Sequence, residues 1–293
     1  MADSYRQPWG ATTPGCVIFL LDQSDSMDRT FGSGRSGEGK MLKDEVATQL
    51  NKSLNEIGRR CIKDESVSPR VDVAVIGYGE LVGGAIGGAL AGRELISIVD
   101  LMEHPLRNDK REKEEMDDTG ELFKYEVDFP IWVEAVSGNG TPMDTALEMA
   151  HQIAKKWIRS HRESFPPLVI NITDGIPNRD PKPAAEALRK LRTNDGAVLL
   201  FNCHISPISE GECLYPGPGD SLPPDKYARG LFEMSSEIPA GMRNLAIKLG
   251  VKRNMKKGDR GFVFNTDASG VMKMIEFATV QAISPEDDPG YGD

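Results

Sequence analysis

The stretch that decides the fold is residues 16–27, CVIFLLDQSDSM. Its first six residues form a continuous apolar run, which is typical of a parallel strand buried on both faces. Asp22, Ser24 and Ser26 follow this run directly. In open α/β sheets, ligands bind beyond the carboxyl ends of the strands. We therefore expect a polar site where this strand ends.

Apolar runs and helical patterns alternate along the rest of the chain. The runs at 71–78 and 168–173 predict central strands, and those at 197–205 and 262–265 predict shorter ones. Apolar residues at helical spacing predict helices near 42–57, 143–157, 184–191, 227–249 (broken near Pro239) and 271–278. This alternation predicts an α/β fold with a doubly wound, mostly parallel central sheet and helices on both faces.

The length of 293 residues suits one large domain with insertions. We expect the domain to span 15–283, after an extension at 1–14 and before a disordered acidic tail at 284–293. A charged insertion around 103–122 contains RNDKREKEEMDD (107–118), which we interpret as a solvated insertion or an exposed helix face. A Pro- and Gly-rich segment around 211–226 predicts a long surface loop.

Composition excludes several function classes. The 35 Lys and Arg residues against 45 Asp and Glu residues give a net charge of −10, which argues against a nucleic-acid partner. We find neither an apolar run near the ~20 residues of a membrane helix nor the layout of a signal peptide. Four scattered cysteines without a CxxC pair fit a reducing compartment. We therefore expect a cytoplasmic protein that does not insert into membranes.

Two further loops after predicted strands carry oxygen side chains. Thr141 lies in GNGTPMDTAL, and Asp174 lies in ITDGIPN. Together with the first loop they supply two carboxylates and three hydroxyls, a set that selects a hard cation, Mg²⁺ first and then Mn²⁺ or Ca²⁺. Because hydroxyls are neutral, such an ion stays electrophilic and keeps water that an incoming carboxylate can displace.

These residues resemble the von Willebrand factor A (vWA) family, whose metal-ion-dependent adhesion site combines D-x-S-x-S with a distant Thr and a distant Asp. The resemblance implies that Ser24, Ser26 and Thr141 bind Mg²⁺ through their hydroxyls. It also implies that Asp22 and Asp174 act mostly through water and by orienting the serines. Asp25 stands where the family usually has Gly, and its carboxylate either becomes a self-ligand or faces solvent.

Each piece of this pattern also has a purely structural interpretation. Asp22 and Ser24 are common turn formers, Thr141 before Pro142 is a common helix N-cap, and Asp174 with Gly175 is an ordinary turn pair. Three such coincidences in three loops that follow strands favour the metal site.

Two rival motifs are weaker. Residues 34–41, GRSGEGKM, nearly spell a phosphate-binding loop, but Met41 stands where that motif needs Ser or Thr. The enzyme alternative is a Mg²⁺-dependent phosphatase or phosphotransferase that uses Asp22 as its nucleophile. Related enzymes carry a second Asp where this chain has Ser24, and we find no His in the position of a base. We therefore predict a protein without catalytic activity.

The resemblance implies metal-dependent recognition of a protein partner that supplies an Asp or Glu ligand. Specificity would come from loops around Gln23, Asp25, 138–140 and 176–179, and binding would be coupled to movement of Thr141 and of the helix at 271–278. The segment YARGLFEMSSEIP (227–239) resembles bacterial tellurium-resistance-associated vWA proteins. That resemblance implies a role in stress response or signalling, with a protein kinase or phosphatase as the partner.

Overall fold

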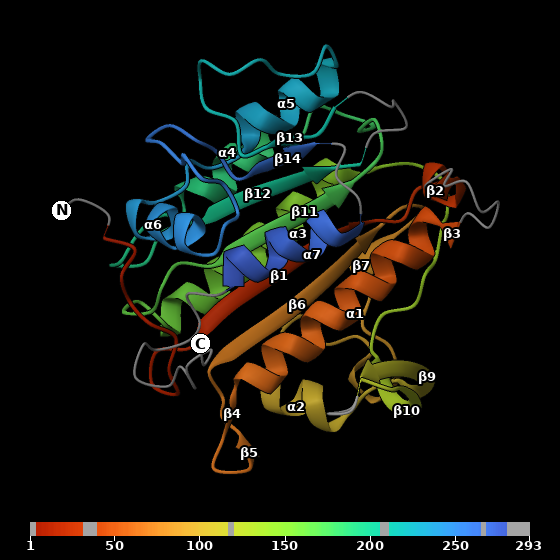
Figure 1. Ribbon diagram of the computed structural model, residues 1–293. Coiled ribbons are helices and arrows are strands. Elements are labelled where there is room, and N and C mark those ends of the chain that lie inside the picture. The colour runs from red at the N-terminus through yellow and green to blue at the C-terminus, as the bar shows by residue number, and fades with distance from the viewer. Residues whose placement is uncertain (1–3, 32–39, 117–119, 206–210, 265–267, 280–293) are drawn as a thin grey trace.

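A mixed sheet forms the centre of the computed structural model, which describes residues 4–31, 40–116, 120–205, 211–264 and 268–279 (Figure 1). Its strand order is β13-β14-β12-β11-β1-β6-β7, and β8 also pairs with β6. The five central strands β14, β12, β11, β1 and β6 are parallel, whereas β7, β8 and β13 are antiparallel. The strands are β1 (Gly15–Asp22), β6 (Val71–Tyr78), β7 (Val82–Gly84), β8 (Ile96–Ser97), β11 (Leu168–Thr173), β12 (Leu199–His204), β13 (Cys213–Leu214) and β14 (Phe262–Phe264).

Helices cover both faces of this sheet. One face carries α1 (Leu42–Arg60), α2 (Ile98–Glu103), α6 (Ala240–Lys248) and α7 (Ala268–Thr279), and the other carries α3 (Met143–Ser160), α4 (Lys182–Lys190) and α5 (Lys226–Met234). Every residue of β1 is buried, and Phe19 and Ile18 point into the two opposite cores. The predicted doubly wound, mostly parallel α/β architecture is confirmed.

Short elements that periodicity does not reveal complete the fold. The sequence predicts none of the antiparallel edge strands β7, β8 and β13, because pieces of two or three residues are too short for a pattern. The remaining short elements are β2 (Thr30–Phe31), β3 (Lys40–Met41), β4 (Ile62–Lys63), β5 (Ser66–Val67) and two 3₁₀ turns, η1 (Asp25–Asp28) and η2 (Gly88–Leu90). The helical break expected near Pro239 separates α5 from α6.

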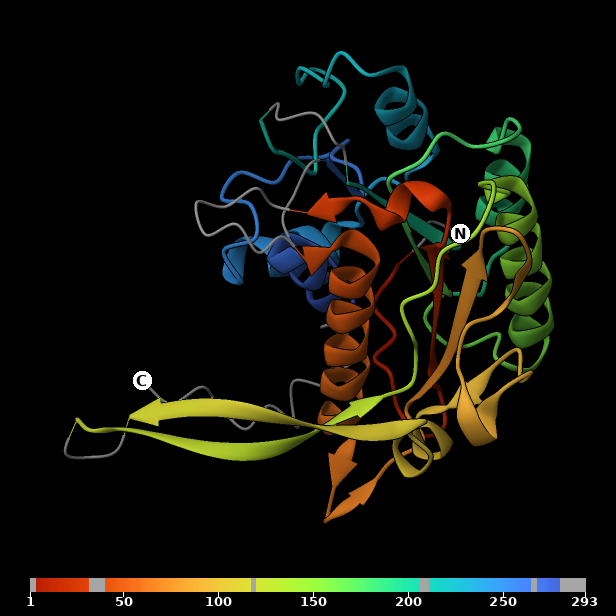
Figure 2. The ribbon, with the colours of Figure 1, turned by 90° about the vertical axis from the view of Figure 1, so that its right-hand side faces the viewer.

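The charged run forms a strand. β9 (Arg107–Met116) pairs antiparallel with β10 (Leu122–Ile131), and the resulting β9–β10 ribbon projects from the body (Figure 2). The interpretation as a helix face is therefore wrong, and the ribbon continues past the expected limit near 122. The alternation FKYEVDF at 123–129 is a strand signal, but the surrounding charges conceal it.

The N-terminal segment packs onto the domain. Trp9 is buried against Gly15, and the Asp195 carboxylate accepts hydrogen bonds from the backbone N–H groups of Arg6 and Gln7 at 3.0 and 3.1 Å. The expected acidic tail at 284–293 and most of the phosphate-loop candidate (32–39) lie outside the described residues. Within the described part of the chain, the helices are all too short or too polar to cross a membrane.

Candidate functional site

The candidate site lies at the carboxyl ends of β1 and β11, which are parallel neighbours in the sheet (Figure 1). The next strand of this sheet after β1 is β6, which lies on one side of β1. β11 lies on the other side of β1, and the strand that follows it, β12, lies further out on that side. The connections after β1 and β11 therefore run in opposite directions and leave a crevice between them. Asp22 is the last residue of β1, and Asp174 follows β11 directly.

A third loop is fixed against the first one by the backbone. The Gln23 N–H donates to the Tyr78 carbonyl at 2.8 Å, and the Gly138 N–H donates to the Gln23 carbonyl at 2.7 Å. Gly77 makes room for this packing, because a Cβ there would lie 2.2 Å from Gln23 Oε1. Residues 138–141 are thus held beside the D-x-S-x-S loop.

Hydroxyls and carboxylates form one connected network at this edge. Asp22 Oδ1 accepts the Ser24 N–H at 2.9 Å, and Asp22 Oδ2 accepts the Thr173 hydroxyl at 2.6 Å. The Ser24 and Ser26 hydroxyl oxygens lie 2.9 Å apart, and the Ser26 hydroxyl donates to Asp174 Oδ1 at 2.7 Å. Each carboxylate therefore orients one of the two serines.

Thr141 completes the cluster from the other side. Its backbone is fixed by Asn178, whose side-chain oxygen accepts the Thr141 N–H at 3.0 Å. Thr141 does not cap α3, since the N-cap is Pro142. A Cβ placed on Gly175 would lie 3.1 Å from both Asp22 Oδ2 and Thr141 Oγ1, and 3.4 Å from Ser24 Oγ. All five residues predicted from the sequence therefore come together, and three of them present oxygens around one hollow, the Gly175 hollow.

Burial raises the cost of negative charge here. It raises the pKa of Asp22 to about 6, although hydrogen bonds from Ser24 and Thr173 act in the opposite direction. Burial also raises the pKa of Asp174, while the Ser26 hydrogen bond and Arg29 lower it. The network thus favours a cation close to its two carboxylates.

Arg29 is a site residue that sequence reasoning missed. Its Nη1 lies 2.9 Å from Asp174 Oδ2, and its Nη2 donates to the Ile205 carbonyl at 2.5 Å. Asp174 Oδ2 makes no hydrogen bond within the described residues, so the Arg29 contact is an ion pair without hydrogen-bond alignment. A single arginine that belongs to no recognisable motif cannot be identified as a site residue from the sequence. The same is true of Asn178.

The chemistry of these donors fits a hard cation. Among the described residues we find no group of three or more His, Cys, Asp or Glu side chains that could hold a metal ion. The Gly175 hollow instead offers hydroxyl and carboxylate oxygens, which suit Mg²⁺, Mn²⁺ or Ca²⁺ and not a soft metal. Asp25 is exposed on η1, which favours its solvent-facing alternative.

Comparison with known proteins finds distant structural likeness only. We find no matching family model and no matching curated protein. Proximal thread matrix protein 1 from the mussel byssus is 12% identical over 94% of this chain and 49% of its own, with a TM-score of 0.48. Manganese-loaded TRAP protein from Plasmodium vivax is 15% identical over 65% of this chain and 57% of its own, with a TM-score of 0.34. The SpRpn10 VWA domain is 14% identical over 67% of this chain and 77% of its own, with a TM-score of 0.32. The chain spans about half the length of the mussel protein.

Proposed function

We propose that this protein is a metal-ion-dependent protein recognition module of the vWA type, with residues 15–283 as its domain. The observation that carries the proposal is the Gly175 hollow, where oxygens of Asp22, Ser24 and Thr141 surround one space. The hydrogen bonds from Ser26 to Asp174 and from Thr173 to Asp22 hold this arrangement before any ion binds. Such preorganisation lowers the cost of binding.

Each residue has a role toward the ion. Ser24, Ser26 and Thr141 would hold Mg²⁺, or Mn²⁺ or Ca²⁺, through their hydroxyls, while Asp22 and Asp174 orient the serines and act through water. The bound ion supplies a Lewis-acidic position that a partner's Asp or Glu carboxylate completes. Arg29 already balances part of the charge of Asp174, so the protein's own carboxylates neutralise the ion only in part.

The phosphatase alternative has less support at Asp22. This carboxylate is 1% exposed, and its two oxygens accept hydrogen bonds from the Ser24 N–H and the Thr173 hydroxyl. A nucleophile needs access to the phosphorus atom, which this burial opposes. His204, at the end of β12, is also buried, and its pKa falls to about 4 because burial disfavours its charged form. It is therefore a poor candidate for a base near neutral pH.

The wider biological role rests on the resemblance of residues 227–239 alone. We place the protein in the cytoplasm, in a bacterial stress-response or signalling complex associated with tellurium resistance. We expect its partner to be a protein kinase or phosphatase. The net charge of −10 supports the expectation that nucleic acid is not a partner.

Calorimetry with Mg²⁺ tests the proposed site. We expect Asp22→Ala and Asp174→Ala to abolish binding, because each removes a carboxylate that orients a serine. Asp25→Ala is the matched control, since it removes an exposed carboxylate from the same loop and should bind like the wild type. Unchanged affinity in both site variants would refute the proposal. Mg²⁺-dependent release of phosphate from an aryl phosphate, lost in Asp22→Asn, would favour the enzyme instead.

A further inference from the structure

A cavity of about 400 Å³ adjoins the Gly175 hollow. It lies between α5 and the loop after β11, on the face of the sheet that α3, α4 and α5 cover, and we call it the α5 pocket. Gly175 lines the cavity as well as the hollow, so the two share a wall. A ligand held at the hollow can therefore place a second group in the α5 pocket.

The wall of the α5 pocket is mainly apolar. On α5, Tyr227, Gly230, Leu231 and Met234 line the cavity at helical spacing, so one face of this helix forms the wall. Met143, the first residue of α3, also lines it. Methionine side chains are flexible and polarisable and adapt to apolar groups of different shape. The wall therefore suits an apolar side chain.

Gly230 keeps this wall open. It lies at the centre of α5, where glycine is less favourable than alanine. A Cβ at this position would meet no atom within 4 Å, and Gly230 is not among the glycines with positive φ. Neither packing nor backbone conformation therefore requires glycine here, and the missing side chain leaves room in the cavity.

The rim of the α5 pocket is basic. Its charged lining residues are Arg179, Lys182, Lys226 and Asp180. Lys182 is paired with Glu233, with 2.6 Å between Nζ and Oε2. Arg179 and Lys226 are exposed and make no ion pair with any described residue. The rim thus has a positive excess although the chain carries a net charge of −10, and this charge favours an acidic ligand.

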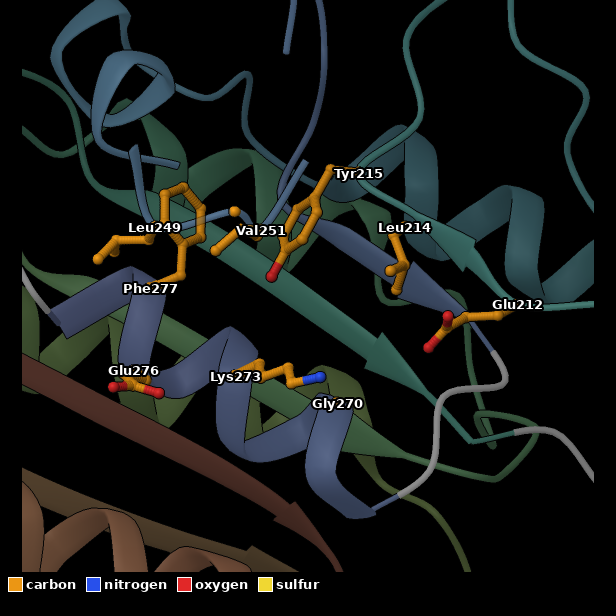
Figure 3. Close-up of a pocket in the computed structure, with 10 residues that line it drawn as sticks. Glu212, Leu214, Tyr215, Leu249, Val251, Gly270, Lys273, Glu276 and Phe277 are labelled. Atoms are coloured by element: carbon orange, nitrogen blue, oxygen red, sulfur yellow. The ribbon is translucent and has the colours of Figure 1, made fainter. Parts of the chain in front are cut away.

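A larger cavity, of about 630 Å³, offers a comparison (Figure 3). It lies on the opposite face of the sheet, between α7, β13 and the segment after α6, and we call it the α7 pocket. Its charged lining residues are Glu212, Lys273 and Glu276, so its lining has no positive excess. None of its lining residues belongs to the network around Asp22 and Asp174. The α7 pocket therefore lacks both features that favour a carboxylate ligand beside the α5 pocket.

We propose that the α5 pocket binds an apolar side chain of the same partner segment whose Asp or Glu completes the ion. The recognised segment carries a carboxylate and an apolar side chain within a few residues, and its further acidic residues face Arg179 and Lys226. Ile176, which is 58% exposed, adds apolar surface between the hollow and the pocket. This inference rests on the proposed metal-dependent recognition and adds the chemistry of the residue beside the acid.

Straight-chain carboxylates from acetate to octanoate test this proposal, because each member of the series joins a carboxylate to an apolar group. With Mg²⁺ present, we expect the affinity measured by NMR titration to rise about two- to fourfold per added CH₂ until the pocket is full. EDTA should abolish the binding of every member.

Gly230→Phe is the decisive variant, and Gly230→Ala is its matched control. The helix accepts both, since a Cβ at this position meets no atom within 4 Å. The phenyl ring fills the pocket, so octanoate should bind Gly230→Phe no more than about threefold tighter than acetate, whereas Gly230→Ala should keep most of the gain. A full gain in a Gly230→Phe variant that folds by circular dichroism would overturn the proposal.

The α7 pocket provides a second control. Leu249 lines that cavity and is 48% exposed. Leu249→Asp should therefore bind octanoate like the wild type. Loss of octanoate binding in this variant would place the probe in the α7 pocket and overturn the proposal.

The basic rim predicts a different effect. Arg179→Gln should weaken every carboxylate alike, by about two- to threefold, because it removes a charge near the hollow and leaves the apolar wall intact. Lys155→Gln is the control, since Lys155 is exposed in the second half of α3 and should not affect binding. Unchanged affinity in Arg179→Gln would remove the acidic character from the proposed segment.

Blocked peptides test whether the ligand is a protein segment. The set contains one Asp among Gly residues, with a Leu one, two or three residues to either side. At least one member should displace octanoate about tenfold better than the peptide without Leu. A set in which Leu never improves displacement would overturn the assignment.

The outcomes separate this inference from the proposed function. Mg²⁺-dependent binding of acetate without any gain along the series would overturn the role of the α5 pocket and leave metal-dependent recognition in place. If no carboxylate binds in a Mg²⁺-dependent manner, this inference fails, and calorimetry of Mg²⁺ with Asp22→Ala then decides the proposed function separately.

Discussion

The carboxyl edge of β1 and β11 carries polar side chains at the ends of strands that are buried on both faces. The end of the β9–β10 ribbon is the reverse, because it carries apolar side chains on two exposed strands. The edge is held by hydrogen bonds such as that from Ser26 to Asp174, and its geometry exists before a ligand arrives. The ribbon end has few contacts apart from those between its own strands. The difference implies that the core fixes the geometry of the edge, whereas the ribbon depends mainly on the pairing of its own two strands.

The largest predicted effect separates the root of the ribbon from its end. Trp132, directly after β10, is fully buried; its Nε1–H donates to the Leu101 carbonyl at 2.6 Å, and Asn51 accepts its backbone N–H at 2.8 Å. We expect Trp132→Ala to lower the free energy of unfolding by about 3–5 kcal/mol. Tyr125→Ala, near the ribbon end, should lower it by less than about 1 kcal/mol.

Urea denaturation of both variants, at the same protein concentration, measures this contrast. Similar losses in the two variants would show that the ribbon folds as one unit with the core. The comparison between a rigid edge and a weakly supported ribbon would then fail.

A second, smaller effect concerns the pH dependence of the edge. The pKa of Asp22 is about 6 in the folded chain, above its ordinary value of 3.8, because the carboxyl is buried. Well below pH 3.8 the group is protonated in both states and has no effect. As the pH rises from about 4 to 6 the unfolded chain ionises first, so stability falls and stays roughly 2–3 kcal/mol lower above pH 6.

The matched variant for this prediction is Asp22→Asn, which cannot ionise. In EDTA, the wild type should lose stability relative to Asp22→Asn between pH 4 and 6, as measured by urea denaturation at each pH. Asp25→Asn should follow the wild type, and Mg²⁺ should restore the loss in the wild type only. If the wild type and Asp22→Asn have parallel pH profiles, burial does not raise the pKa of Asp22.

The sequence predicts the edge well because the edge is built from the core. The apolar run at 16–21 is typical of a strand covered on both faces, and loops that follow parallel strands meet at one edge. The positions of Asp22, Ser24 and Asp174 follow from that topology. Arg29 and Asn178 do not, because their contacts depend on loop conformation and have no characteristic spacing.

The strands of the ribbon are not predicted from the sequence, for a related reason. Burial pattern reveals a strand only where one face meets a core, and most of β9 is exposed on both faces. Its charges therefore look the same as those of a solvated helix. Only the alternating apolar residues of β10, such as Phe123 and Tyr125, carry a strand signal.

The smallest predicted effect concerns the positive charge that the edge already holds. Arg29 is paired with Asp174 at 2.9 Å, and its side chain is 25% exposed. A bound cation and this guanidinium repel each other, but solvent screens part of the repulsion. We expect Arg29→Gln to bind Mg²⁺ about three- to tenfold more tightly in calorimetry, which corresponds to roughly 1 kcal/mol.

Arg59→Gln is the control for this prediction, because it removes the same charge from the last turn of α1, about 26 Å along that helix from its start near η1. Its Mg²⁺ affinity should match that of the wild type. Weaker binding in a folded Arg29→Gln variant would mean that Arg29 holds Asp174 in position for the ion. The geometry of the edge would then depend on a loop contact as well as on its strands. The edge, like the ribbon, would then be held in part by contacts outside the core.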